Sequence, residues 1–138
     1  MKASENEFNT SIFPKGDLAA AAYFTGKAWV KMLVPNDPVL NTAVGNVMFE
    51  AGARNNWHTH PGGQILIVTQ GTGYYQEAGK PIQLLRVGDV INIQPELKHW
   101  HGASPNSEFT HIAISTNTER GIVDWLEPVT DEEYNSFK

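Results

Sequence analysis

The sequence predicts an all-β domain, an antiparallel sandwich or barrel that ends in one short helix. Short runs rich in β-branched and aromatic residues recur along the chain, and glycine or proline turn signals separate them at intervals of roughly 8–12 residues, as in β-sandwiches and barrels. The 138 residues, 41% of them hydrophobic, suffice for one domain that buries a core without cross-links. We therefore expect a single domain, residues 18–138, preceded by an N-terminal arm, residues 1–17.

The segment after the arm combines a weak helical signal with a stronger extended one. Ala19–Ala22 is compatible with one helical turn, because alanine has the highest helix propensity. Gly26 and the β-favouring Trp29 and Val30 instead predict that residues 22–34 are extended.

Two prolines, Pro35 and Pro38, predict a connection, because proline lacks the backbone N–H that a strand ladder uses. Near the C-terminus, Thr130 and Glu133 have the spacing of a capping box, so a short helix should begin there and cover a sheet edge. Between these points the strand candidates are Thr42–Glu50, Gln64–Thr69, Gly73–Glu77, Gln83–Leu85, Val90–Ile93 and Phe109–Ser115.

Two pairs of histidines have the spacing of metal ligands. One residue separates His58 from His60, and one separates His99 from His101. Side chains at positions i and i+2 project from the same face of a β-strand, about 6.5–7 Å apart at Cα, so two imidazoles can converge on one ion. Gln64 follows a Pro-Gly-Gly turn, and a hairpin-like return of the chain would bring it beside His60.

These residues resemble the cupin superfamily. The stretch from Gly52 to Gly71 reproduces its first motif, in which two glycines bracket His-x-His and a glutamate, except that Gln64 replaces the glutamate. Gly88 and His99 match the second motif. Within the superfamily, the chain is similar to the small single-domain cupins that include bacterial hydroxynitrile lyases and relatives of carboxymuconolactone decarboxylase. The resemblance implies the cupin double-stranded β-helix, a jelly-roll barrel. In the second motif, the usual proline, glycine and asparagine are replaced by Gln94, Glu96 and Ala103.

The spacing and the resemblance together predict one divalent metal ion bound by His58, His60, Gln64 and His99. The resemblance implies manganese or iron, and by the Irving–Williams order such a nitrogen-rich site would also take zinc, nickel or copper if offered. A neutral amide is a weaker ligand than a carboxylate and leaves the charge of the ion uncompensated. Gln64 is therefore either an ordinary amide at a strand edge or a ligand that makes the ion a stronger Lewis acid.

His101 and His111 are the candidate acid–base residues. His101 shares a strand face with His99, so it should lie close to the ion but outside its set of ligands. His111 alternates with Ala113 and Ser115 on one face of its strand, which predicts a polar wall of a cavity. An equal alternative for each histidine is a bond to a backbone carbonyl or the orientation of a metal ligand.

Four other residues near these motifs have plainer interpretations. Trp57 and Trp100 alternate with metal-ligand candidates and should face away from them, into a core. Arg54 lies in a polar turn, where a solvated surface charge is expected. Glu96 follows a proline and is expected to be exposed.

Composition excludes several classes of function. The formal charge of −5 comes from 15 acidic and 10 basic side chains without a basic cluster, so the electrostatic footprint of a nucleic-acid-binding protein is missing. The absence of cysteine excludes disulfides, thiolate ligands and a thiol nucleophile. No stretch approaches the roughly 20 apolar residues of a membrane span, and no signal peptide is evident, so a cytoplasmic location is expected. Ser-His-Asp, phosphate-loop and dinucleotide patterns are also missing.

The resemblance implies a metal-dependent enzyme for a small molecule, foremost a Lewis-acid lyase of the hydroxynitrile-lyase type, which splits a cyanohydrin into an aldehyde and cyanide. Its ion would hold the nitrile or the hydroxyl oxygen, and His101 or His111 would take the hydroxyl proton. One alternative is an iron-dependent dioxygenase, since three nitrogens leave positions on Fe(II) open. Another is a non-catalytic protein whose ion anchors a small ligand. Cupins commonly self-associate, so a homodimer or homotetramer is expected.

Overall fold

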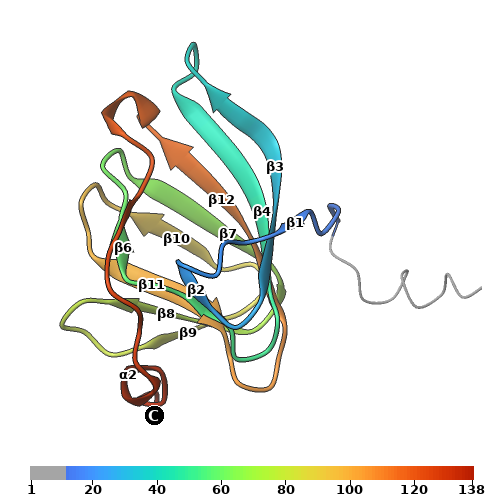
Figure 1. The fold of residues 1–138 in the computed structure, drawn as a ribbon, viewed down its shortest axis with the longest axis vertical. Helices are drawn as coiled ribbons and strands as arrows, with labels where there is room; N and C mark the ends of the chain where they lie inside the picture. The colour runs from blue at the N-terminus through green and yellow to red at the C-terminus, as the bar shows by residue number, and fades with distance from the viewer. Residues whose placement is uncertain (1–11) are drawn as a thin grey trace, which may run out of the picture.

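Two antiparallel β-sheets face each other in a computed structural model that describes residues 12–138 (Figure 1). The expected N-terminal arm, residues 1–17, lies largely outside the described residues, and Asp17 already belongs to strand β1 (Asp17–Leu18). Within residues 12–138, no helix is long and apolar enough to cross a membrane. The described chain is therefore the nearly all-β sandwich that the strand and turn pattern predicts.

The first sheet supplies the wall that carries His111. Its central strand, β12 (Phe109–Thr116), pairs on one side with β4 (Thr42–Phe49) along its full length and on the other side with β7 (Gln64–Gly71). The register between β12 and β7 shifts at Thr110 and His111, as at a β-bulge. The sheet order is β1, β3 (Ala28–Asp37), β4, β12, β7 and β10 (Val90–Ile93).

The second sheet is built from shorter strands and carries the two histidine pairs. Its longest strands, β8 (Gly73–Glu77) and β11 (His99–Ala103), pair with each other, and β11 also pairs with β6 (His58–Thr59). This sheet runs in the order β13 (Asp124–Trp125), β6, β11, β5 (Arg54–Asn55) and β2 (Phe24–Thr25), with β8 and then β9 (Gln83–Leu85) added beside β11.

Two apolar clusters lie on opposite sides of the second sheet. The larger one fills the space between the sheets, and the smaller one lies under the C-terminal helix α2 (Asp131–Tyr134). Trp57 and Trp100 both belong to the smaller cluster, which confirms their predicted core role. The buried members of the larger cluster are Ala28, Phe49, Ala53, Leu66, Val68, Tyr75, Leu85, Ile93, Ala103 and Phe109.

The predicted capping box is present, but the helix that it starts covers a face and not an edge. Thr130 Oγ1 accepts from the Glu133 N–H at 3.0 Å, and the Glu133 carboxylate accepts from the Thr130 N–H at 2.8 Å. Tyr134 then packs on Trp100 and donates its hydroxyl to the Ala103 carbonyl at 2.6 Å. The helix is thereby fastened to the outward face of the second sheet.

One expectation for the N-terminal half is wrong. Pro35 lies inside β3 and not in a connection, because β3 continues to Asp37 through two irregularities in its pairing with β4, where a missing N–H is tolerated. The alanine run forms a single turn, in which the Tyr23 N–H donates to the Ala20 carbonyl at 3.1 Å, and the chain then enters β2.

The expected surface position of Arg54 is also wrong. The residue is only 6% exposed, and Nη2 donates to the Val129 carbonyl and to Asp131 Oδ1, both at 2.8 Å. The guanidinium also lies over the Tyr134 ring, 4.7 Å from its centroid. The sequence motif around Arg54 gives no sign of this partner segment, which comes from 75 residues further along the chain.

Replacement of Arg54 by alanine is expected to lower the free energy of unfolding by about 2 kcal/mol, because it removes the cation from Tyr134 and leaves the Val129 carbonyl without its donor. The matched control is Lys98→Ala, which removes the exposed ion pair with Glu127 and the more distant contact of the ammonium with the Trp57 ring, 5.3 Å from its centroid, and should cost less than about 1 kcal/mol. Urea unfolding monitored by tryptophan fluorescence measures both. Equal effects of the two substitutions would contradict a structural role for Arg54.

Candidate metal centre

Three buried imidazoles converge where the second sheet meets the loop after β6. His58 and His99 are direct cross-strand partners on β6 and β11, and His60 follows two residues after His58. One ring nitrogen from each of the three lies within 4.8 Å of the others. The ring centroids of His58 and His99 are 4.2 Å apart, and that of His60 lies 4.9 Å from His58. The structure thus brings together three of the predicted ligands as a group that could hold a metal ion.

Each of these imidazoles is fixed by a bond from its other nitrogen to a backbone carbonyl. Nδ1 of His58, His60 and His99 lies 2.8, 2.7 and 2.8 Å from the carbonyl oxygens of Asn56, Ile122 and Leu97. Since a carbonyl only accepts, each Nδ1 carries the hydrogen, and each Nε2 keeps a lone pair. This is the arrangement that orients histidine ligands in metal sites.

The unpartnered atoms of the site fit a cation. Nε2 of His60 and of His99 is buried without a hydrogen-bond partner, and so is Oε1 of Gln64. Buried polar atoms without partners are costly, so their place among the converging imidazoles and beside His60 indicates a missing partner. All three atoms are electron-pair donors, and a divalent ion is the partner that suits such a donor set.

The turn that closes over His60 has a glutamate where the cupin motif has glycine. Glu96 occupies the position where the motif has glycine, and it adopts φ of 65°, in the left-handed region. Its N–H donates to the His60 carbonyl at 3.0 Å, which compensates the strain of that backbone conformation. Its side chain is exposed, as predicted.

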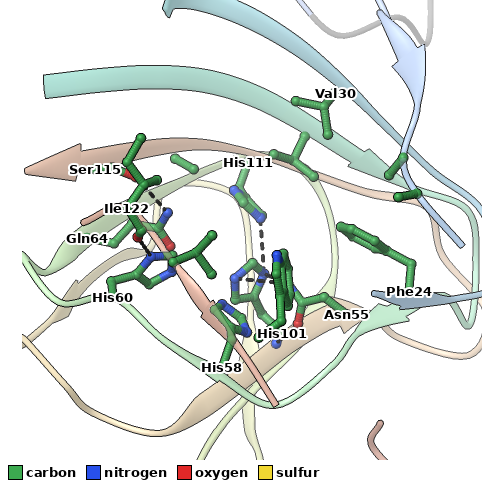
Figure 2. A pocket seen from close by; sticks show the side chains of 16 residues that line it. Phe24, Val30, Asn55, His58, His60, Gln64, His101, His111, Ser115 and Ile122 are labelled. Atoms are coloured by element: carbon green, nitrogen blue, oxygen red, sulfur yellow. Dashed lines mark hydrogen bonds between the residues drawn. The ribbon is translucent and has the colours of Figure 1, made fainter. Parts of the chain in front are cut away.

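His101 and His111 form a second, directly bonded pair beside the three imidazoles. His111 Nε2 lies 3.2 Å from His101 Nδ1, and Figure 2 shows the two rings pointing toward each other from opposite sheets. One of these nitrogens carries a hydrogen and the other accepts it. The His101 ring centroid is 5.4 Å from that of His58, so His101 lies next to the metal-ligand candidates without joining them.

Burial lowers the pKa of all five histidines. It lowers the pKa of His99 and of His111 to about 4. For His58 and His101, burial and then the neighbouring imidazoles hold the pKa well below its usual range. Burial also lowers the pKa of His60, and the bond to the Ile122 carbonyl and the neighbouring Gln64 amide partly offset this effect. All five imidazoles are therefore neutral at neutral pH, which is the form that binds metals and accepts protons.

The metal-free protein is expected to lose thermal stability as the pH falls from about 7 to about 5. In the unfolded chain, histidine takes up a proton near pH 6.5, whereas the buried imidazoles of the folded protein are protonated only at lower pH. The stability that these groups contribute is therefore complete above pH 6.5 and is lost as the pH falls toward the pKa values of the folded state. The melting temperature should fall by at least about 5 °C over a range that most carboxylates do not yet affect. A constant melting temperature would contradict the neutral, buried state of these histidines.

A cavity of about 300 Å³ opens next to both histidine groups. His111, Ala113 and Ser115 line it together, which confirms the predicted polar wall on β12. Figure 2 shows Phe24 at one side and Gln64 with His60 at the other. Among the described residues, no lysine or arginine lines the cavity. The apolar part of the lining comes from Ala19, Ala20, Phe24, Val30, Val47, Ala113, Ile122, Val123 and Trp125.

Asn55 and Trp125 are among the cavity residues that the sequence analysis does not identify. The Asn55 amide oxygen accepts from the backbone N–H of His101 at 2.9 Å, and this fixes β5 against the His101 strand. Trp125 stacks on Tyr23 with ring centroids 4.8 Å apart and lies equally close to His58. Strands β5 and β13 have two residues each, too few for a periodic pattern, so no sequence signal places these side chains.

Comparison with known proteins gives consistent matches. The cupin domain pattern matches residues 45–114. An (R)-mandelonitrile lyase from Granulicella tundricola is 47% identical over 115 residues, which are 83% of this chain and 87% of that protein. A cupin-like protein from Thermotoga maritima, known from its crystal structure, has 53% sequence identity and a TM-score of 0.89 over 92% of this chain and 97% of its own. A DMSP lyase from Ruegeria pomeroyi shares the fold, with a TM-score of 0.62 and 15% identity over 93% of this chain and 66% of its own.

Proposed function

Because the chain belongs to the cupin family, we propose that it is a metal-dependent lyase that splits a cyanohydrin into an aldehyde and hydrogen cyanide. The observation that carries the proposal is that three converging, neutral imidazoles lie next to a cavity, and that a hydrogen-bonded pair of histidines lines the same cavity. The similarity to an (R)-mandelonitrile lyase supports this reaction and makes an R-configured aromatic cyanohydrin the first substrate to test.

The ligands that we assign are His58, His60 and His99 through Nε2 and Gln64 through Oε1. Manganese or iron is the ion that we expect, and the neutral donor set leaves its full charge available. When bound, the ion supplies Lewis acidity that stabilises negative charge developing on the substrate. The protein's own contribution is to hold the four donors and to keep bulk water away from them through the burial of all three imidazoles.

The pair of His101 and His111 is suited to take the hydroxyl proton of a cyanohydrin. Both imidazoles line the cavity, and both are neutral at the pH where the enzyme would work. As the O–H bond breaks, its proton moves to the pair, the oxygen electrons form the C=O bond, and the C–C bond breaks with its electrons on cyanide. The low pKa of the pair then favours return of the proton to cyanide, which leaves as hydrogen cyanide.

The cavity supports a neutral and largely apolar substrate. Its volume of about 300 Å³ is at the lower end of small-molecule sites, and its walls include Phe24 and Trp125. An anionic substrate would find no lysine or arginine among the described lining residues. A small arylaldehyde cyanohydrin combines one aromatic group for these walls with a hydroxyl and a nitrile for the polar end.

Release of benzaldehyde from mandelonitrile, followed by its ultraviolet absorbance, tests the proposal. The manganese- or iron-loaded protein should release it at least about 100-fold faster than the metal-free protein, with preference for the R enantiomer. Oxygen uptake is recorded in the same cuvette. Equal rates for the two forms would overturn the lyase proposal in favour of a binding protein. Oxygen consumption that requires iron and accompanies turnover of another substrate would overturn it in favour of a dioxygenase.

A further inference from the structure

Ser115 is the direct cross-strand partner of Gln64, the one uncharged amide among the proposed ligands. The two residues pair in the register of β12 with β7, and both side chains point into the cavity. Gln64 Nε2 donates to Ser115 Oγ at 3.2 Å, and Figure 2 shows this contact beside His60. Gln64 and Ser115 are 7% and 6% exposed, so water has little access to either group.

The two ends of the Gln64 amide have opposite chemistry, and only one can face a cation. The oxygen offers lone pairs, whereas the nitrogen offers only hydrogens. Here Nε2 is bonded to Ser115, and Oε1 is buried without a hydrogen-bond partner. A carboxylate at this position would present an oxygen in either orientation, so the question of which end faces the imidazoles arises only because the residue is glutamine.

We infer that Ser115 is a positioning residue, whose hydroxyl accepts the Gln64 Nε2–H and thereby holds the amide oxygen toward the three imidazoles as the fourth donor for a divalent ion. The inference rests on the metal site of the proposed function and does not depend on which reaction the protein catalyses. Without this acceptor, the amide nitrogen keeps a buried, unpaired hydrogen whenever the oxygen faces the ion, and that state becomes costly.

A purely structural role for Ser115 would act through the strand and not through Gln64. The backbone of Ser115 pairs with Gln64 on one side and with Ala43 on the other, and these ladder contacts are the same for alanine. The two roles therefore differ in one measurable respect. A positioning role disappears when Gln64 loses its amide, whereas a structural role remains.

The test is the affinity of the metal-free full chain for Mn²⁺, measured from the electron paramagnetic resonance signal of the free ion during titration. Ser115→Ala should raise the Kd by about 10–100-fold, the usual effect of removing a residue that orients a ligand. Ser115→Thr, which keeps the hydroxyl acceptor, should restore most of the affinity. Ser104→Ala is the matched control, because it removes a similarly buried hydroxyl that bonds Thr72 and does not line the cavity.

The decisive comparison repeats the substitution in a Gln64→Ala background. There, addition of Ser115→Ala should change the Kd by less than about two-fold, because the two side chains act as one coupled unit. An equal loss of affinity in both backgrounds, an unchanged Kd for Ser115→Ala alone, or no Mn²⁺ binding by the unaltered chain would overturn the inference. Failure to cleave mandelonitrile, together with the predicted pattern of Kd values, would overturn the proposed function and leave the role of Ser115 supported.

Discussion

Replacement of His99 by alanine is expected to weaken Mn²⁺ binding by more than the roughly 10–100-fold that loss of an outer, orienting partner costs. The Nε2 of His99 is buried without a hydrogen-bond partner and lies close to the ring nitrogens of His58 and His60. The substitution therefore removes one of the four proposed metal ligands and leaves a gap that water fills poorly. Turnover of the cyanohydrin should fall with metal content. Metal analysis of protein purified from manganese-supplemented cultures, followed by Mn²⁺ titration, measures the effect.

The same strand offers a closely matched control. His101 lies two residues after His99, on the same face, and is also buried, but its ring nitrogens are not part of the converging group. His101→Ala therefore removes an imidazole of equal size while keeping all four proposed donors, and it should retain metal at nearly one ion per chain. Similar metal loss in both variants would show that general disruption of β11, and not the loss of a ligand, is responsible.

The parts of this site that the sequence predicts are those set by local geometry. The alternation of a β-strand places His58 with His60 and His99 with His101, and no knowledge of the rest of the chain is needed. The same rule predicts that His111, Ala113 and Ser115 face a cavity, which the structure confirms. The glycines and turn signals around these strands likewise predict an all-β fold.

The parts that were missed depend on contacts between segments far apart in the sequence. Arg54 looks like a surface charge because the neighbouring residues are polar, yet Val129 and Asp131 fold over it and turn it into a buried link to α2. Trp125 becomes a cavity wall only because a two-residue strand pairs with His58. Pro35 looks like part of a connection because the irregular pairing that admits it in β3 leaves no local signal in the sequence.

Replacement of His111 by phenylalanine is expected to lower kcat for cyanohydrin cleavage by about 10²–10⁴-fold, the usual contribution of a positioned acid–base residue. Phe49 and Phe109 already contact the His111 ring, with centroids 5.8 and 5.5 Å away, so a phenyl ring suits the surroundings but takes no proton. Metal affinity and KM should change little, because the four proposed ligands and the apolar walls remain. In the unaltered protein, kcat/KM should also fall at acid pH as His101 and His111 become protonated, and the part of this fall that depends on His111 should be missing in the variant. A variant that retains kcat within about three-fold would exclude His111 as the proton acceptor and leave that role to His101 or to a solvent-derived base, since the loss expected for a true acid–base residue is far larger.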